Sequence, residues 1–192
     1  MGEITIRPYR LDDKKAVRDI CIQTSSIPAC TEKDILFLLT MYNDCYTEQY
    51  PDFCFVAADS EDHPIGYILC APEYNSYCDV FRKIYLPRLK QRTITRWIAA
   101  CTASKAEEKQ MKKLAERGYP AHMHIDILDA YQRRGIGTQL LQRLKGHLRD
   151  QNIHGLCLGV GSGNKKGVAF YRKQGFEVLQ KLGGSLMMGI QF

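Results

Sequence analysis

The sequence predicts a mixed α/β protein built around a single layer of β-sheet. Short apolar or alternating segments typical of strands are interspersed along the chain with segments of helical periodicity, an order that favours helices packed on a mixed sheet. Hydrophobic residues make up 45% and charged residues 25%, which is the balance of an ordinary globular protein. The length of 192 residues predicts one domain spanning 1–192.

The first 70 residues predict a strand, two helices and a hairpin. Residues 3–9 alternate between apolar and polar side chains, as a half-buried strand does. One helix is expected from Asp12, and a second from Thr31, where Thr-Glu-Lys-Asp resembles a capping box. The apolar segments 53–58 and 65–70 flank turn residues and predict a hairpin.

Residues 72–118 combine dense charge with aromatic side chains, and we expect them to be mostly helical. A break is predicted near Pro87, and Gly118 is expected to end the last helix. The aromatic residues of this insertion are Tyr74, Tyr77, Phe81, Tyr85 and Trp97. Two interpretations stay open: a solvated helical insertion, or a lid over a ligand with the aromatic rings facing inward.

From residue 121 onward the pattern alternates regularly between strands and helices. Residues 121–128 and 155–160 predict strands, and the glycine-containing turn 132–138 between them leads into a strongly amphipathic helix. Asn164 is expected to cap a further helix, which ends at Gly175. The chain then closes with predicted strands at 176–179 and 186–192.

Composition and charge exclude several classes of protein. Lys and Arg exceed Asp and Glu by 27 to 21, and this net charge of +6 attracts polyanions of many kinds. No apolar run approaches the roughly 20 residues of a membrane span, and residues 1–6 have no leader-like pattern. The eight cysteines lack metal-type spacing, and several lie in apolar runs. We therefore expect a cytoplasmic protein with reduced thiols and no membrane partner.

The most informative segment is the turn between the strand at 121–128 and its following helix. It comprises Gln132, Arg133, Arg134, Gly135, Ile136, Gly137 and Thr138. Glycines at a strand-to-helix junction let successive N–H groups converge on an anion, and the helix N-terminus adds its dipole. A dinucleotide fingerprint fails because Leu140 stands where a third small residue is needed, and no Walker A sequence is present. A diphosphate site and an ordinary tight turn both remain open.

Together with that turn, Asn164 and the segment 169–176 resemble the GNAT superfamily of N-acetyltransferases. The matching motifs are Gln-x-x-Gly-x-Gly at 132–137 and Ala-Phe-Tyr-Arg-Lys-Gln-Gly-Phe at 169–176. The resemblance implies an acyl-CoA N-acyltransferase fold over 1–192, with a mostly antiparallel sheet that splays at the cofactor site. It also implies a helical insertion, 72–118, between strands 3 and 4, similar to the acetyltransferase-like domains associated with O-GlcNAcases. Asp129 departs from the family, which often has Pro there.

The resemblance further implies that acetyl-CoA is the cosubstrate and that its acetyl group passes directly to a primary amine of a small molecule or peptide. The pyrophosphate would lie on the N–H groups of residues 133–138. The pantetheine amides would pair with the exposed backbone of the adjacent strand near Ile127 and Leu128. The residues implied in cofactor binding are Ile127, Leu128, Gln132, Arg133, Arg134, Gly135, Ile136, Gly137, Thr138, Asn164 and Lys166. Asn164 has the second interpretation of a simple helix cap.

Catalysis of this transfer needs a general acid and a general base. The resemblance places Tyr171 as the acid that protonates the departing thiolate. His122, His124 and Asp126 share one strand face, and we expect His124 and Asp126 to serve as the base. Two alternatives remain for this face: buried hydrogen-bonded histidines, or a zinc site. Nothing else in the sequence requires a metal, so none is expected.

Other functions compete with the enzyme. A catalytically idle acyl-CoA-binding or protein-interaction module would have the same fold, although Tyr171 and the intact turn favour catalysis. The basic stretch 82–96 suggests nucleic-acid binding, but no base-reading motif accompanies it, so no nucleic-acid partner is expected. The acceptor amine follows from no motif, and both a monomer and a homodimer remain open.

Overall fold

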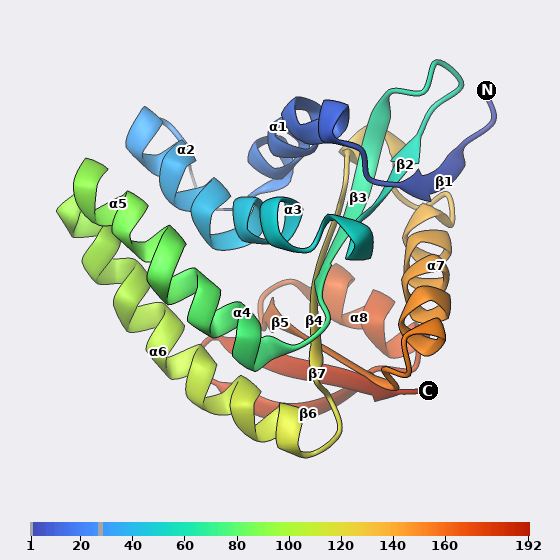
Figure 1. Cartoon of the computed structure of the whole chain (residues 1–192). Helices are drawn as coiled ribbons and strands as arrows, with labels where there is room; N and C mark the ends of the chain where they lie inside the picture. The colour runs from blue at the N-terminus through green and yellow to red at the C-terminus, as the bar shows by residue number, and fades with distance from the viewer. Residues whose placement is uncertain (1, 27–28) are drawn as a thin grey trace.

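The computed structural model describes residues 2–26 and 29–192, and within them the strands form one mixed sheet (Figure 1). In spatial order the strands are β1 (Thr5–Pro8), β2 (Phe55–Ala58), β3 (Pro64–Ala71), β4 (Ala121–Ile127), β5 (Gly155–Gly161), β7 (Ser185–Gln191) and β6 (Glu177–Leu182). Every neighbouring pair is antiparallel except β4 and β5, which run parallel. The predicted fold class, a mostly antiparallel mixed sheet, is confirmed.

Helices cover both faces of this sheet. One face carries α1 (Lys14–Thr24), α2 (Glu32–Leu39), α3 (Cys45–Gln49) and the insertion, which comprises α4 (Tyr74–Val80), the π-helical turn η4 (Phe81–Tyr85), α5 (Leu86–Arg92) and α6 (Ile94–Glu116). The other face carries α7 (Ile136–Asp150) and α8 (Lys165–Lys173) (Figure 1). Thr31 begins α2 as predicted, because its hydroxyl accepts the Asp34 N–H in a capping box.

The alternation of side chains in β3 explains why two cores form. Tyr67 and Leu69 point into the cluster beneath α1 and the insertion, whereas Ile68 and Cys70 point into the cluster beneath α7. Each of these side chains is fully buried. A central strand that is apolar on both faces is therefore what fixes the layered arrangement.

The insertion differs from the prediction at Pro87. The chain passes through Pro87 without leaving the helix, because the preceding turn η4 widens to π-helical winding, and the break lies instead at Thr93, whose backbone is extended. A proline lacks the N–H that bonds back to the preceding turn, and wider winding accommodates its ring. Gly118, at φ +91°, ends α6 as predicted.

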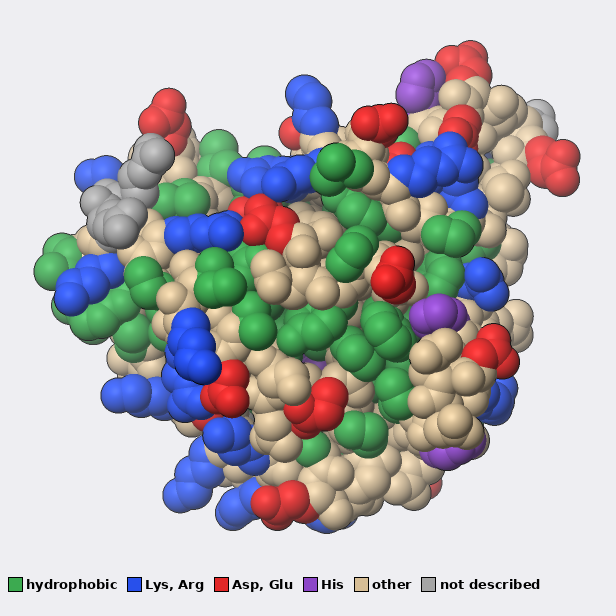
Figure 2. All heavy atoms as spheres, viewed as in Figure 1, with side chains coloured by type: hydrophobic (Ala, Val, Ile, Leu, Met, Phe, Trp, Pro, Cys, Tyr) green, Lys and Arg blue, Asp and Glu red, His purple; other side chains and the backbone are tan. Residues whose placement is uncertain are grey.

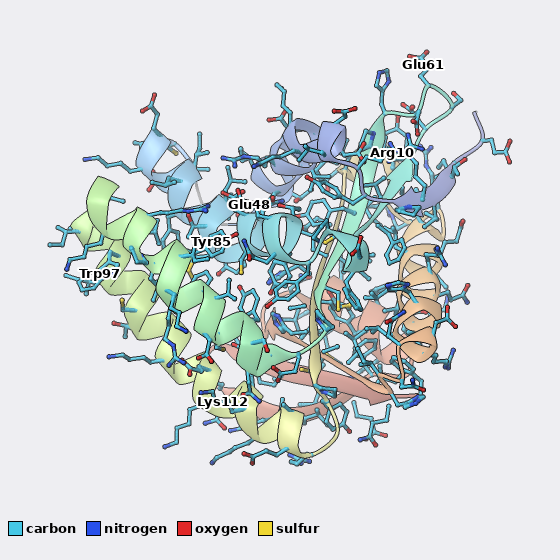
Figure 3. All side chains as sticks on the ribbon, in the orientation of Figure 1. Arg10, Glu48, Glu61, Tyr85, Trp97 and Lys112 are labelled. Atoms are coloured by element: carbon cyan, nitrogen blue, oxygen red, sulfur yellow. The ribbon has the colours of Figure 1, made fainter. Side chains whose placement is uncertain are left out.

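Charged side chains fasten the insertion to the N-terminal helices. Glu48 on α3 accepts hydrogen bonds from the Tyr85 hydroxyl and from Arg88, each at 2.9 Å, and from Lys14 at 3.1 Å. Figure 3 shows Glu48 and Tyr85 facing each other between these two parts of the molecule. The bonds to Arg88 and Lys14 lower the pKa of Glu48 against the opposing effect of burial, so its carboxylate stays ionised at neutral pH.

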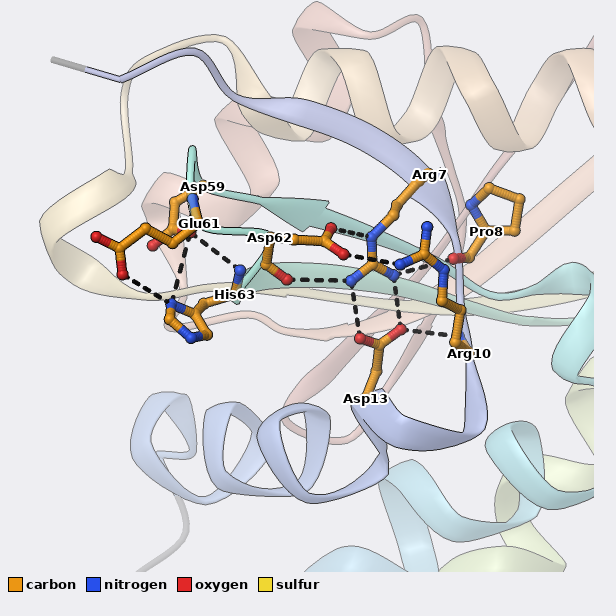
Figure 4. Close-up of polar contacts among 8 residues, drawn as sticks. All are labelled: Arg7, Pro8, Arg10, Asp13, Asp59, Glu61, Asp62 and His63. Atoms are coloured by element: carbon orange, nitrogen blue, oxygen red, sulfur yellow. Dashed lines mark hydrogen bonds and ion pairs between the residues drawn. The ribbon is translucent and has the colours of Figure 1, made fainter.

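A second charge cluster secures the edge strand β1. The guanidinium of Arg7 donates to both carboxylate oxygens of Asp13, at 2.7 and 2.9 Å, and also to Asp62 in the β2–β3 turn (Figure 4). Arg10 adds a second bond to Asp62 at 2.7 Å. Because Arg7 and Asp13 are both buried, this bidentate pair ties the first strand to the start of α1.

The basic residues of the insertion lie at the surface, as their density in the sequence suggests. Figure 2 shows Lys and Arg side chains gathered on the outer side of the insertion, over α5 and α6. The side chains of Arg92 and Arg96, which belong to the basic stretch 82–96, lie outside the described residues. Among the residues that are described, no helix combines the length and apolar character needed to cross a bilayer.

Candidate functional site

The two central strands separate to leave a gap. β4 and β5 pair only at Ala121–Leu156 and His122–Cys157, while β4 continues to pair with β3 as far as Ile127. The change shows in the burial of β4, where residues 121–123 are buried and 124–127 are partly exposed. The sheet is therefore splayed at its centre, as expected.

The register of β3 with β4 determines which backbone groups face this gap. The N–H of Leu128 donates to the carbonyl of Ile65, so this pair and every second pair before it are hydrogen-bonded. The intervening residues Met123, Ile125 and Ile127 direct their backbone groups the other way, toward β5. Beyond the last β4–β5 pair, these groups line the gap.

Leu128 does not have the free backbone expected of it. Its N–H is used by Ile65, and its carbonyl accepts the N–H of Tyr131 at 2.8 Å. Ile127 does face the gap, where its carbonyl accepts a hydrogen bond from the Gln132 side chain at 3.0 Å. The backbone of Ile125 faces the gap, unlike that of Leu128. The sequence did not indicate Ile125, because only the register of β3 with β4 identifies it.

The glycine turn lies where β4 ends. A short 3₁₀ turn, η5 (Asp129–Tyr131), leads to Gln132, whose side chain also bonds Asp129 at 2.8 Å. Asp129 thus ties the turn together where the family often has proline. Arg133 and Gly135 have left-handed backbones, with φ of +61° and +80°, and Gly135 is the N-cap of α7.

The first turn of α7 presents N–H groups to the space beside the gap. Ile136, Gly137 and Thr138 are its first residues, and by position their N–H groups have no partner within the helix. A β-carbon at Gly137 would lie 3.1 Å from the ring of Phe170 on α8, so a side chain there would crowd the two helices. The positive end of the helix dipole adds to the attraction of an anion.

Charged and polar groups surround this turn. The exposed Arg133 and Arg134 extend from it, and the guanidinium of Arg134 lies 5.2 Å from the ring centre of Tyr131. Asn164 caps α8, since its Oδ1 accepts the Gly167 N–H at 2.9 Å. Lys166 follows on the first, exposed turn of α8. These residues give the neighbourhood of the turn a positive charge.

The candidate base residues lie on the face of β4 that is covered by the N-terminal helices and the insertion. His122 is buried and its Nδ1 lies 2.7 Å from the Tyr46 hydroxyl, while His124 packs edge-on against Tyr42 and Tyr46. Burial lowers the pKa of His124 to about 4, and burial together with the neighbouring His124 lowers that of His122 well below its usual value. Both imidazoles are therefore neutral at pH 7.

Asp126, next along the same face, behaves differently. Burial raises its pKa to about 6, while the Tyr67 hydroxyl, which donates to its Oδ2 at 2.6 Å, opposes that rise. Its carboxylate is thus mostly ionised at pH 7 yet a far stronger proton acceptor than an exposed aspartate. Sequence reasoning missed Tyr67 and Tyr46, which the fold brings to Asp126 and His122 from elsewhere in the chain.

Tyr171 lies on α8, across the sheet from these histidines. It is half-buried against the α7-side core, between the rings of Phe170 and Phe176. Burial and then the charge of Asp126 raise its pKa above the usual value for tyrosine. The charge of Asp126 therefore acts on Tyr171 from the other side of β4, and the phenol stays protonated at neutral pH.

A metal site on this face finds no support. His122, His124 and Asp126 follow one another on β4, but among the described residues no three His, Cys, Asp or Glu side chains are grouped closely enough to hold a metal ion. Instead, hydrogen bonds with Tyr46 and Tyr67 engage His122 and Asp126.

Comparisons with known proteins agree with this geometry. The acetyltransferase (GNAT) family model matches residues 22–176. A curated relative from Pseudomonas aeruginosa, an L-methionine sulfoximine/L-methionine sulfone acetyltransferase, is 34% identical over 62 residues, which span 32% of this chain and only 36% of that relative.

Solved structures resemble the whole chain. SsHAT has a TM-score of 0.84 at 24% identity over 98% of both chains. The PaiA N-acetyltransferase from Thermoplasma acidophilum, solved with coenzyme A, has a TM-score of 0.62 at 15% identity over 99% of both chains. These likenesses establish the shared fold, and the family model covers most of the sequence. The chain therefore belongs to the acetyltransferase (GNAT) family.

Proposed function

We propose that this protein is an N-acetyltransferase that moves the acetyl group of acetyl-CoA directly to a primary amine. The observation that carries the proposal is the gap between β4 and β5, where unpaired backbone of β4 lies beside the glycine turn and the N-terminus of α7. This arrangement suits a long ligand that has amides at one end and a diphosphate at the other. In this proposal residues 1–192 form one acetyltransferase domain.

The N–H groups of residues 133–138 bind the pyrophosphate in this proposal. Arg133, Arg134 and Lys166 add positive charge, Gln132 holds the turn against β4, and Asn164 supports the arm while capping α8. Along β4 the N–H groups of Ile125 and Ile127 pair with the pantetheine amides and polarise the thioester carbonyl. A backbone donor aimed at a developing oxyanion contributes about 3 kcal/mol to such a reaction.

Asp126 is the proposed general base. With a pKa of about 6 it is mostly ionised at neutral pH and still accepts a proton from the attacking amine, directly or through water. His124, whose pKa of about 4 makes it a weaker base, lines the approach as a neutral hydrogen-bonding group. Tyr67 orients the Asp126 carboxylate.

Tyr171 is the proposed general acid. Its raised pKa keeps the hydroxyl protonated until a thiolate departs nearby, and transfer of that proton prevents the reverse reaction. The charge of Asp126 contributes to that raised pKa, so ionisation of the base favours the protonated state of the acid. The protons balance for an amine that attacks in its neutral form: the amine loses one proton to Asp126, and the thiolate gains one from Tyr171. The proton on Asp126 then returns through solvent to the Tyr171 phenolate, which restores both groups.

Two measurements test the proposal. Isothermal calorimetry with acetyl-CoA measures binding, and CoA release on a panel of primary amines, followed with a thiol reagent, measures turnover. We expect micromolar binding together with turnover. Binding without turnover on any amine would favour the idle module, and absence of binding would refute the proposal. We place the protein in the cytoplasm, which its thiol-rich composition supports.

A further inference from the structure

An exposed apolar cluster lies at the outer end of the insertion. Of the four large hydrophobic side chains that stay exposed among the described residues, three belong to the insertion: Ile84, Ile94 and Ile98. Ile94 and Ile98 are 60% and 54% exposed, and because they are four residues apart on α6 they lie on one face of that helix. Neither the core nor the proposed chemistry accounts for two neighbouring isoleucines that face water.

Trp97 and Lys90 complete this cluster. The indole is half-buried, and Nζ of Lys90, which lies on α5, is 5.2 Å from the centre of the ring. We call Lys90, Ile94, Trp97 and Ile98 the tip. Figure 3 shows Trp97 at the outer end of the insertion, and in Figure 1 this end of α5 and α6 lies away from α8 and from the gap between β4 and β5. A partner can therefore contact the tip without obstructing the proposed active site.

The tip lies in the most basic part of the chain. Residues 80–106 include seven Lys and Arg and no Asp or Glu, whereas the rest of the chain has 20 Lys and Arg against 21 Asp and Glu. This segment therefore carries the whole positive excess of the protein. Two of its arginines, Arg82 and Arg88, are bound to carboxylates. The exposed lysines that have no carboxylate partner among the described residues are Lys83, Lys90 and Lys105.

Charge and apolar character together indicate the chemistry of the partner. A second copy of the chain offers either an equally positive segment or a surface with almost no net charge, so electrostatics does not favour self-association through the tip. Nucleic acid would attract the lysines, but its phosphates leave the two exposed isoleucines in water. A bilayer that contains anionic lipid suits both kinds of side chain, because its headgroups attract lysine and its acyl boundary buries isoleucine.

The order in which the tip side chains are exposed favours a bilayer over an acidic protein. Tryptophan and lysine are the residues that lie at headgroup level, where the indole and the ammonium keep polar contacts. Ile94 and Ile98 are exposed, whereas Trp97 is half-buried, so the isoleucines would enter furthest. We propose that the tip docks the protein on a membrane surface that contains anionic lipid. Such docking is peripheral and needs no spanning helix, and it differs from the expectation of no membrane partner, which considered spanning segments.

Co-sedimentation with sucrose-loaded vesicles tests the docking. One set of vesicles is phosphatidylcholine alone, and the other is an equimolar mixture of phosphatidylcholine and phosphatidylglycerol. We expect the full chain to bind the anionic vesicles at least about tenfold more tightly than the neutral ones, because each free lysine near the surface adds attraction. Added salt should weaken this binding by screening. Equal binding to the two sets, or no binding to the anionic set, overturns the proposal.

The fluorescence of Trp97 shows which surface makes the contact. It is the single tryptophan of the chain, so its emission reports on the tip alone. With bromine on the acyl chains of the phosphatidylglycerol, we expect the emission to be quenched and to shift to shorter wavelength on binding. Vesicle binding without either change would place the contact on another surface and refute docking through the tip. This measurement involves no acetylation, so its outcome is independent of the proposed function.

Matched apolar variants separate the tip from the rest of the surface. Ile94→Ser combined with Ile98→Ser removes the exposed apolar side chains, and we expect at least about tenfold weaker binding to the anionic vesicles. Leu11→Ser is the control, because Leu11 is 78% exposed and lies outside the insertion. It should change vesicle binding less than about twofold, since scattered apolar residues contribute little. Thermal melting checks that the variants fold. Equal losses in the two proteins would contradict a specific role of the tip.

A second pair of variants tests the charge. Lys83→Gln with Lys90→Gln removes two free cations of the insertion, and Lys173→Gln with Lys181→Gln removes two exposed cations on α8 and β6. We expect the first pair to weaken binding to anionic vesicles at least about fivefold and the second pair to change it less than about twofold. The same loss in both pairs would mean that net charge alone attracts the protein, and would overturn the proposal.

Competition distinguishes the bilayer from other polyanions. Duplex DNA and polyglutamate are titrated separately into the protein bound to anionic vesicles. We expect neither to displace the wild type at charge concentrations equal to that of the lipid, because neither buries Ile94 and Ile98. Displacement by DNA would assign the basic segment to nucleic acid, and displacement by polyglutamate would assign it to an acidic protein. Either result would refute docking on a membrane.

Discussion

The hydroxyl of Tyr67 donates a hydrogen bond to Oδ2 of Asp126, with 2.6 Å between the two oxygens. The bond follows from the register of the sheet, because Tyr67 on β3 lies directly opposite Asp126 on β4 and both side chains point to the same face. It stabilises the ionised carboxylate, whereas burial favours the protonated one. Tyr67 thus controls how readily the proposed base ionises near neutral pH.

Replacing Tyr67 with phenylalanine tests this control. Without this donor, burial is opposed only by the hydrogen bond from Thr24, so the pKa of Asp126 rises above about 6. We expect the acidic limb of the kcat/KM profile to move to higher pH by up to about one unit, while the rate at pH 9 is retained. Tyr9→Phe is the control, because the Tyr9 hydroxyl is buried without a hydrogen-bond partner among the described residues. An unmoved limb in Tyr67→Phe contradicts the assignment.

Asp126→Asn removes the proposed base while keeping the shape of the side chain. We expect kcat/KM to fall about 10²- to 10⁴-fold, with the affinity for acetyl-CoA unchanged. If the variant retains the wild-type rate across pH 6–9, Asp126 is not the base.

The same variant is also expected to be more stable at neutral pH. The folded pKa of about 6 lies above the reference value of 3.8, so the ionised carboxylate costs stability. This cost is complete above pH 6 and disappears as the pH falls from 6 to about 4. Asn carries no charge, and we expect a gain of roughly 1–3 kcal/mol at pH 8. Urea unfolding at pH 8 and pH 4 measures it, and a gain of the same size at both pH values would contradict this explanation.

Tyr171→Phe removes the proposed acid. Because the thiolate must then leave unprotonated, we expect kcat to fall about 10²-fold while acetyl-CoA binds as tightly as before. The raised pKa of Tyr171 further predicts that the wild-type enzyme shows no alkaline limb up to pH 9. Calorimetry and a pH series of initial rates measure the two effects. A variant that loses binding rather than turnover would assign Tyr171 to packing instead.

The fold class and the position of the glycine turn could be predicted because they depend on local patterns. An apolar segment beside a turn reveals β3, and alternation reveals β4. The capping box at Thr31 fixes a helix start, and the glycines at 135 and 137 mark the turn that leads into α7. The faces of β4 also followed from alternation alone, since His124 and Asp126 share one of them. These features need no knowledge of distant contacts.

The rest depends on contacts between distant segments. Pairing of Tyr67 with Asp126 requires the register of β3 with β4, and the stacking of Tyr46 on Tyr77 requires the insertion to fold back over α3. Whether the backbone N–H of Ile125 or that of Leu128 is exposed depends on which of the two groups is hydrogen-bonded to β3. Likewise the helix breaks at Thr93 and not near Pro87 as expected, because the π-helical turn before Pro87 accommodates the proline ring.

Two glycines near α7 allow backbone strain to be separated from the loss of a side-chain contact. Gly135 has φ +80°, and a β-carbon there would meet no atom within 4 Å, so Gly135→Ala is costly only through its left-handed backbone. That conformation costs an L-residue roughly 1–2 kcal/mol. Gly146 lies inside α7 with equally open surroundings, and Ala there stabilises the helix by roughly 0.5–1 kcal/mol.

We therefore expect Gly135→Ala to lower the free energy of unfolding and Gly146→Ala to raise it. The two variants should also differ in their affinity for acetyl-CoA. Relief of strain at position 135 would turn the N–H groups of residues 133–138 away from a common centre, so we expect acetyl-CoA affinity to fall about tenfold in Gly135→Ala, about 1.4 kcal/mol. Gly146→Ala, remote from the turn, should bind as the wild type does. If Gly135→Ala is destabilised yet binds acetyl-CoA normally, the turn serves the fold alone and the phosphates lie elsewhere.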